Sequence, residues 1–224
     1  MVLMRVCPWC RRSEPWRRGC RCLPDPAGGP VLREIVGIDL ALAVHDYDEV
    51  VRRFVLAAKN GGREDLLRRF GVQIAAVLAA QADNLPDSWG ERRPTVVWVP
   101  ASRDRRRRRG YDQGRLLARA VGRELGLPVQ PLLRRAGGEA QEGRDRADRL
   151  SGPRLRCRVG RAPSHVVVVD DVITTGASVG AAAAALRGSG AVMVVAVAVA
   201  SSGSNGVNHP PVGNAGSRQV SGLW

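Results

Sequence analysis

Residues 166–178 bring together two adjacent carboxylates, three hydroxyl groups and a glycine. Four consecutive valines precede Asp170 and Asp171, which predicts a strand buried on both faces with the carboxylates at its carboxyl end. In an open α/β sheet, that end is where ligands bind. A Thr-Thr-Gly-Ala-Ser loop follows, with a helix predicted from Gly180, and the N-terminus of a helix favours an anion. The segment therefore offers carboxylates for hydroxyl groups or a metal, and a phosphate site beside them.

A buried strand, a polar turn and a helix without any ligand would give the same order of elements. The Walker phosphate loop is excluded, because no Gly-Lys-Ser/Thr sequence follows the turn. We favour a ligand site, because each of the thirteen residues from 166 to 178 has a role in one.

A second candidate segment is Lys59-Asn60-Gly61-Gly62, which contains the only lysine of the chain. Two glycines let the backbone approach a ligand closely, and the lysine adds a positive charge. The same residues also fit a helix over residues 48–58 that ends in a glycine cap. Both interpretations stay open, and the position of the single lysine favours ligand binding.

Residues 103–109 hold six arginines and one aspartate, a net charge of +5, and Gly110-Tyr111-Asp112-Gln113 follows. Such a run is usually a solvated loop. It follows a strand predicted over residues 95–99, so it lies beside the expected crevice. Two functional alternatives are a loop that closes over the ligand and a contact with single-stranded nucleic acid, with Tyr111 as a stacking platform. Arg108, Arg109, Tyr111 and Gln113 are the residues expected to serve either role.

Four of the five cysteines lie near the start of the chain, as Cys7-Pro8-Trp9-Cys10 and Cys20-Arg21-Cys22. Four thiolates within sixteen residues suit one tetrahedral, structural Zn²⁺, whose binding would supply folding energy to so small a segment. Reduced cysteines without a metal are the alternative. Cys157 is isolated in the sequence and is expected to have no part in the site.

The composition is that of a globular protein of a size that fits one α/β domain with small additions. Its 224 residues are 44% hydrophobic, enough for one sizeable core, and the net charge is +14 with arginine as nearly all of the basic residues. That charge is compatible with nucleic acid or polyphosphate partners. No targeting segment or membrane span is expected, so a cytoplasmic location is predicted. We expect a cysteine-rich module over residues 1–24, a main domain over residues 35–200, and a disordered tail over residues 201–224.

The segment from Val166 to Ser178 resembles the phosphoribosyl-pyrophosphate (PRPP) loop of type I phosphoribosyltransferases. The resemblance implies a mainly parallel sheet flanked by helices and an Mg²⁺-dependent PRPP site. It assigns the ribose hydroxyls to Asp170 and Asp171, which would be the catalytic acids, and the pyrophosphate to residues 59–62. The remaining PRPP contacts that it implies are Val169, Thr174, Thr175, Gly176, Ala177 and Ser178.

The order of parts is similar to that of the ComF family, in which a small zinc finger precedes a phosphoribosyltransferase-like domain. The segments that carry this similarity are the cysteine pairs, residues 58–62, 99–100 and 109–113, Gln141 with Arg149, and the PRPP loop. Asp112 stands where that family usually has Asn. The resemblance implies a role in natural competence, with single-stranded DNA and competence proteins as partners. It leaves open whether the protein is a transferase with an unknown acceptor or a non-catalytic sensor of PRPP or nucleotide.

Overall fold

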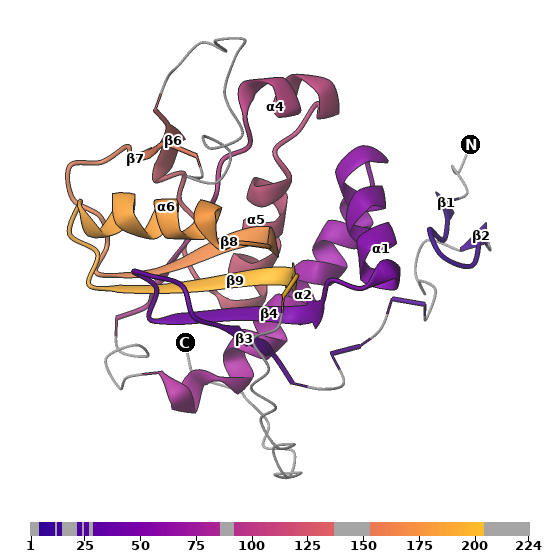
Figure 1. Cartoon of the computed structure of the whole chain (residues 1–224), viewed down its shortest axis with the longest axis horizontal. Coiled ribbons are helices and arrows are strands. Elements are labelled where there is room, and N and C mark those ends of the chain that lie inside the picture. Colours follow the sequence, from indigo (N-terminus) through magenta and orange to yellow (C-terminus); the bar gives the residue numbers. More distant parts are fainter. Residues whose placement is uncertain are drawn as a thin grey trace.

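A five-stranded sheet forms the centre of the computed structural model, in the order β3-β4-β9-β8-β5 (Figure 1). β3 is antiparallel to β4, and all other neighbours are parallel. The predicted α/β class with a mainly parallel sheet is therefore confirmed. The strands are β3 (Val31–Arg33), β4 (Leu40–Asp46), β5 (Thr95–Trp98), β8 (His165–Ile173) and β9 (Met193–Ser201). The structure describes residues 5–11, 13–14, 22–23, 25–26, 29–85, 92–136 and 153–203.

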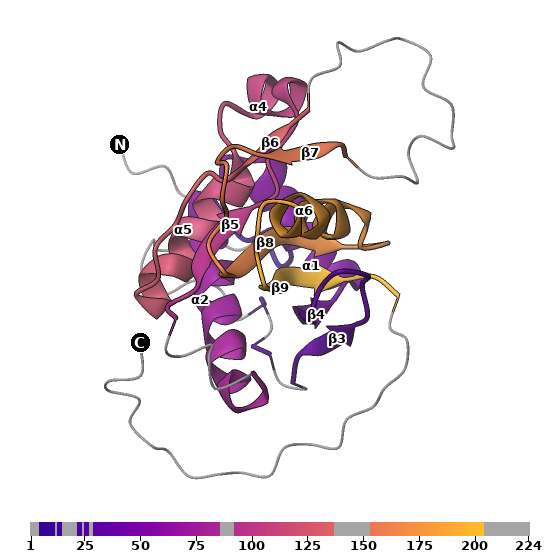
Figure 2. The same ribbon diagram turned by 90° about the vertical axis from the view of Figure 1, so that its left-hand side faces the viewer.

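Helices cover both faces of this sheet, which explains the uninterrupted valines and alanines of its central strands. α1 (Glu49–Asn60), α2 (Glu64–Ala80) and α5 (Gln113–Leu125) pack on one face, and α6 (Ala177–Arg187) packs on the other (Figure 2). Alternation along β8 sends Val167 and Val169 to the first face, and Val166 and Val168 to the second. A short 3-10 helix, η1 (Ala82–Asn84), follows α2.

The arginine run is a helix rather than the predicted loop. α4 (Arg103–Arg109) begins after Ser102, whose Oγ accepts a hydrogen bond from the backbone N–H of Arg105 at 3.3 Å. It ends at Gly110, whose positive φ of 77° suits a residue without a Cβ. The cap residues at both ends outweigh the repulsion between neighbouring arginines, and all side chains of α4 except Arg109 are exposed.

A two-stranded ribbon accompanies α4 at the same edge of the molecule (Figure 2). It consists of β6 (Leu133–Arg135) paired antiparallel with β7 (Leu155–Cys157). The inward residues Leu133 and Leu155 pack onto the face that α6 covers. The ribbon therefore extends that layer towards the carboxyl edge of the sheet.

The cysteine segment packs against α1. β1 (Arg5–Val6) pairs with β2 (Ser13–Glu14), and the guanidinium of Arg53 in α1 lies 4.9 Å from the ring centre of Trp9. Cys7 and Leu23 are buried in the core beneath α1. Within the described ranges, no helix has the length and apolar character needed to span a bilayer.

Three predicted boundaries are wrong by a few residues. α1 continues through Asn60, α6 begins at Ala177 instead of Gly180, and β8 continues through Ile173, beyond both carboxylates. Ser201, assigned to the tail from sequence, is buried as the last residue of β9. The rest of the predicted tail from residue 204 onward, together with Gln141 and Arg149, lies outside the described residues.

Candidate functional site

Asp170 and Asp171 lie where β8 extends past its neighbour β5. The β5–β8 ladder ends at the pair Trp98 and Val169, whereas β9 accompanies β8 as far as Ile173. Asp171 lies on the side of α1, where Nζ of Lys59 reaches its carboxylate, and Asp170 is within electrostatic reach of Arg135 from the ribbon. Both side chains are half-buried. From Asp170 onward β8 therefore has no paired strand on the β5 side, at the carboxyl end of the sheet, which is where ligands bind in such folds.

Lys59 meets the carboxylates from α1. Its Nζ lies 3.0 Å from Oδ2 of Asp171, and the two side chains are 20% and 25% exposed. The lysine is therefore held at the carboxyl edge of the sheet by a partly desolvated ion pair and not in open solvent. Two segments that the sequence analysis connected only through a resemblance meet here in space.

Tyr111 and Gln113 hold the end of α1 that carries Lys59. The Tyr111 hydroxyl donates to the carbonyl of Ala58 at 2.6 Å, and Nε2 of Gln113 donates to the carbonyl of Lys59 at 2.8 Å. Arg109 in turn donates to Oε1 of Gln113 at 2.6 Å. These bonds satisfy two of the carbonyls that the end of a helix leaves without partners. Tyr111 and Gln113, which were expected to close over the ligand or to contact nucleic acid, thus support the end of α1, while Arg108 is exposed on α4.

The Asp170 carboxyl titrates near neutral pH. Burial, and secondly the charge of Asp171, raise its pKa to about 7. The backbone N–H of Asp171, which donates to Oδ1 of Asp170 at 2.8 Å, acts in the opposite direction, as do the charges of Lys59 and Arg135. Asp170 therefore carries a proton for part of the time at pH 7 and lacks a full countercharge. Such a carboxyl gains the most from a cation or a hydrogen-bond donor brought by a ligand.

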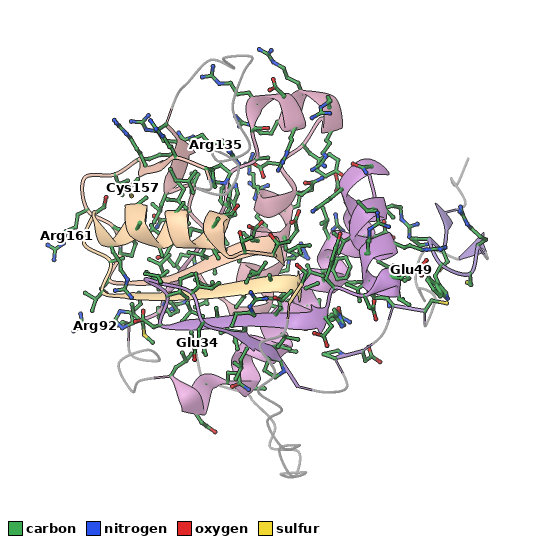
Figure 3. The ribbon with its side chains drawn as sticks, in the orientation of Figure 1. Glu34, Glu49, Arg92, Arg135, Cys157 and Arg161 are labelled. Carbon is green, nitrogen blue, oxygen red and sulfur yellow. The ribbon has the colours of Figure 1, made fainter. Side chains whose placement is uncertain are left out.

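Arg135 is a crevice residue that the sequence analysis missed. This half-buried side chain comes from β6, and its Nε donates to the carbonyl of Pro100 at 2.9 Å (Figure 3). Burial, followed by the charge of Arg105, lowers its pKa, while Asp170 and Asp112 act to raise it. Arg135 therefore lies within electrostatic reach of Asp170 and of α4. Sequence offered no signal for it, because arginines are frequent throughout this chain.

Thr174, Thr175 and Gly176 form the turn between β8 and α6. Gly176, the N-cap residue of α6, has a φ of 77° and makes no side-chain bond to the helix. Oγ1 of Thr175 accepts from the backbone N–H of Ala177 at 3.3 Å. Both threonines are exposed, and Ala177 and Ser178 are half-buried in the first turn of α6. An uncapped helix N-terminus with hydroxyls beside it has the donors that a phosphate group needs.

The other predicted ligand residues surround this crevice at different depths. Val169 is fully buried, and its carbonyl accepts from the N–H of Val99 at 3.2 Å, so it lies beneath the carboxylates. Asn60, Gly61 and Gly62 are exposed at the end of α1, and Gly62 has a φ of 61°. Asp112, the departure from the ComF pattern, caps α5 by accepting from the N–H of Arg115 at 3.4 Å.

Hard divalent cations fit the donors of the crevice. Two half-buried carboxylates with unequal countercharge offer the oxygen ligands that Mg²⁺ prefers. Asp170 is the carboxylate without an ion-pair partner among the described residues, because Lys59 pairs with Asp171.

The cysteine segment contains a second candidate metal site. The sulfur atoms of Cys7, Cys10 and Cys22 all lie within 4.8 Å of one another. Tetrahedral zinc with Zn–S bonds of about 2.3 Å would separate its sulfurs by about 3.8 Å, so the cluster fits one ion. Burial, followed by the hydrogen bond and charge of Cys10, raises the pKa of Cys22 to about 11. Cys20, the fourth predicted ligand, lies outside the described residues.

The comparisons with known proteins give little guidance. No family model matches the chain, and no curated protein matches it. One structurally similar chain is adenine phosphoribosyl transferase from Trypanosoma brucei in complex with AMP, pyrophosphate and ribose-5-phosphate. The identity is 15%, the match covers 85% of this chain and 96% of that chain, and the TM-score is 0.40. This similarity is too low to transfer any function or residue role.

Metal analysis tests the cysteine site. We predict about one zinc per chain in protein purified under reducing conditions, because a single tetrahedral ion satisfies the cluster. Cys10→Ser should lose the zinc and lower the stability of the module. Cys157→Ser is the matched control, because Cys157 lies in β7 and should leave the metal content unchanged (Figure 3). Freshly reduced wild-type protein without zinc would exclude the site.

Proposed function

We propose that this chain binds PRPP together with Mg²⁺ at the carboxyl edge of β8. The observation that carries the proposal is the convergence of Lys59, Asp170 and Asp171 next to the uncapped N-terminus of α6. PRPP has three parts that need different partners: a 5′-phosphate, a ribose with two hydroxyls, and a pyrophosphate. The crevice offers a helix N-terminus for the first, carboxylates for the second, and a cation on α1 for the third.

In this proposal the turn of Thr174, Thr175 and Gly176 binds the 5′-phosphate through N–H and hydroxyl groups. Asp170 and Asp171 accept hydrogen bonds from the ribose hydroxyls or ligate the metal. Lys59 and the backbone of Asn60, Gly61 and Gly62 bind the pyrophosphate. Bound Mg²⁺ would neutralise negative charge on the leaving pyrophosphate.

The reaction class that fits is phosphoribosyl transfer. A lone pair of an acceptor forms a bond to the anomeric carbon, the bond from that carbon to the pyrophosphate oxygen breaks, and pyrophosphate leaves with the electron pair. The chain contributes by positioning and charge, because the oxocarbenium-like state develops positive charge beside Asp170 and Asp171. Thr174, at the position where some purine phosphoribosyltransferases have a catalytic Asp, cannot act as a base for the acceptor.

The biological setting rests on the resemblance to the ComF family. We infer a link to DNA uptake in natural competence, in the cytoplasm, with the zinc module as a small accessory unit. The alternative is a non-catalytic sensor that binds PRPP or a nucleotide and signals to competence proteins. The two differ in one observable: a transferase releases pyrophosphate when it is given PRPP and its acceptor, whereas a sensor does not.

Replacing both carboxylates tests the PRPP site. The double variant Asp170→Asn/Asp171→Asn should weaken the binding of Mg²⁺-PRPP by more than about tenfold, because removing each charge-assisted hydrogen bond costs roughly 1.5–3 kcal/mol. Calorimetry at pH 8 measures this with Asp170 largely ionised, since its pKa is about 7.

The matched control is Asp46→Asn/Asp83→Asn, which removes the same charge from two exposed residues, one of them at the carboxyl end of β4. It should bind as wild type does. Unchanged affinity in the folded crevice variant, or a wild type that does not bind PRPP, would contradict the proposal.

Single-stranded DNA is a second candidate ligand, favoured by the exposed arginines of α4 and the ribbon. Arg134 and Arg156 face each other across β6 and β7, and both are exposed. Like charges directly opposite each other destabilise a strand pair, and binding of an anionic partner would relieve this repulsion. Arg154 and Arg158 are also exposed on β7 or beside it, and α4 adds five exposed arginines. A polyanion would neutralise this repulsion.

The salt dependence of binding tests this second function. Replacing the five exposed arginines of α4, namely Arg103, Arg105, Arg106, Arg107 and Arg108, with Gln should weaken single-stranded DNA binding and flatten its salt dependence. The log–log slope should change by about 0.7 for each phosphate that the variant no longer neutralises. The control replaces five exposed arginines of α1, α2 and α5, namely Arg52, Arg68, Arg115, Arg119 and Arg123. Equal slopes for the two variants would show only a general effect of net charge.

A further inference from the structure

Arg33, at the end of the edge strand β3, binds the backbone of two segments that meet beside the crevice. Its NH2 donates to the carbonyl of Thr174 at 3.2 Å, in the turn that precedes α6. Its NH1 donates to Oγ of Ser201 at 2.9 Å, to the carbonyl of Ser202 at 2.7 Å, and to the carbonyl of Gly203. One guanidinium thus satisfies three backbone carbonyls, one of them at the start of the proposed phosphate-binding turn.

The same turn is tied to β9 by a second set of bonds. Oγ of Ser201 donates to the carbonyl of Ile173 at 3.1 Å, and the N–H of Ser202 donates to the same carbonyl at 3.0 Å. Arg33 therefore closes a ring of hydrogen bonds that contains the last residue of β8, the first residue of the turn, and the end of β9.

Ile35 supports the turn by packing. A Cβ added to Gly176 would lie 3.0 Å from two carbon atoms of Ile35, so the isoleucine fits directly under the glycine. Gly180, one turn further along α6, has Ile35 as its nearest side chain. Arg33 and Ile35 thus contact both ends of the turn between β8 and α6. We call these two residues the brace.

We propose that the brace positions the N–H and hydroxyl donors of Thr174, Thr175 and Gly176 for the 5′-phosphate of the ligand. This inference rests on the proposed PRPP site. The turn is exposed to solvent on one side, so contacts on its other side must hold it in place. Ordering a mobile turn when the ligand binds would cost free energy and weaken affinity, and a turn that is already ordered avoids this cost. Arg33 is a positioning residue, since its contacts are with protein backbone and side-chain oxygens.

Arg187 provides a matched comparison at the other end of α6. Its guanidinium donates to the carbonyls of Gly37 and Val192 at 2.8 Å each, and to Oδ2 of Asp39 at 2.6 Å. Arg187 therefore makes a similar set of bonds to segments near β3 and β9, at the end of α6 opposite the turn. Replacing either arginine removes a comparable set of bonds, and of the two only Arg33 contacts the turn.

Titration of the full-length protein with ribose 5-phosphate, and separately with pyrophosphate, tests the inference. Arg33→Ala should weaken ribose 5-phosphate binding about tenfold, because the turn loses its preorganisation. Pyrophosphate binding, which depends on the Lys59 end of the crevice, should stay as in wild type. Arg187→Ala should leave both affinities unchanged. Urea unfolding of each variant shows whether the two substitutions lower the free energy of unfolding by similar amounts.

Arg33→Lys and Ile35→Ala keep the test valid if Arg33→Ala does not fold. Lysine keeps the positive charge but lacks the planar guanidinium group that reaches several acceptors. The affinity of Arg33→Lys for ribose 5-phosphate should therefore lie between those of the wild type and Arg33→Ala. Wild-type affinity in folded Arg33→Ala, or an equal loss in Arg187→Ala, would overturn the role of the brace and leave the PRPP site intact. A wild type that binds neither PRPP nor ribose 5-phosphate would overturn both.

Discussion

The candidate site depends on the unequal lengths of the neighbouring strands β8 and β5. β8 continues four residues beyond its last pair with β5, while β9 stays paired to it. Two carboxylates inside a strand covered on both faces would normally cost too much desolvation energy. They are tolerated here because the edge left by β5 is open, and because Lys59 compensates one of them at 3.0 Å. The raised pKa of Asp170 is the residual cost of that arrangement.

The surrounding elements hold these charges in place from separate directions. α1 brings Lys59, and its last carbonyls are satisfied by Tyr111 and Gln113 from the start of α5 and the turn before it. The edge strand brings Arg33 beneath the turn that follows β8. Tyr111, Gln113 and Arg33 all bind backbone carbonyls. The carboxylates and the donors of the turn remain available to a ligand, which is the arrangement expected of a preorganised site.

Local sequence predicted the central elements because their signals are strong and short-range. The four valines and the alanine-rich helix predicted the buried β8 and its partner layer, and the two aspartates marked the carboxyl edge. The sequence could not predict that β8 continues past Asp171, because the ladder that extends it is made with β9. It could not predict Arg135 or Arg33 either, since their roles depend on contacts with residues distant in the chain, such as Pro100 and Thr174. The loop predicted for the arginine run was wrong because Ser102 and Gly110 cap it as a helix.

The central claim is that one ligand joins the turn after β8 to the end of α1. Hydrogen exchange of the backbone amides, measured with and without PRPP and Mg²⁺, tests it most directly because it reports both segments in one experiment. The account predicts slower exchange at residues 174–178 and at residues 59–62, with no change in the ribbon strand β7. Ribose 5-phosphate alone should protect only residues 174–178. Unchanged exchange in both segments at saturating PRPP would contradict the claim.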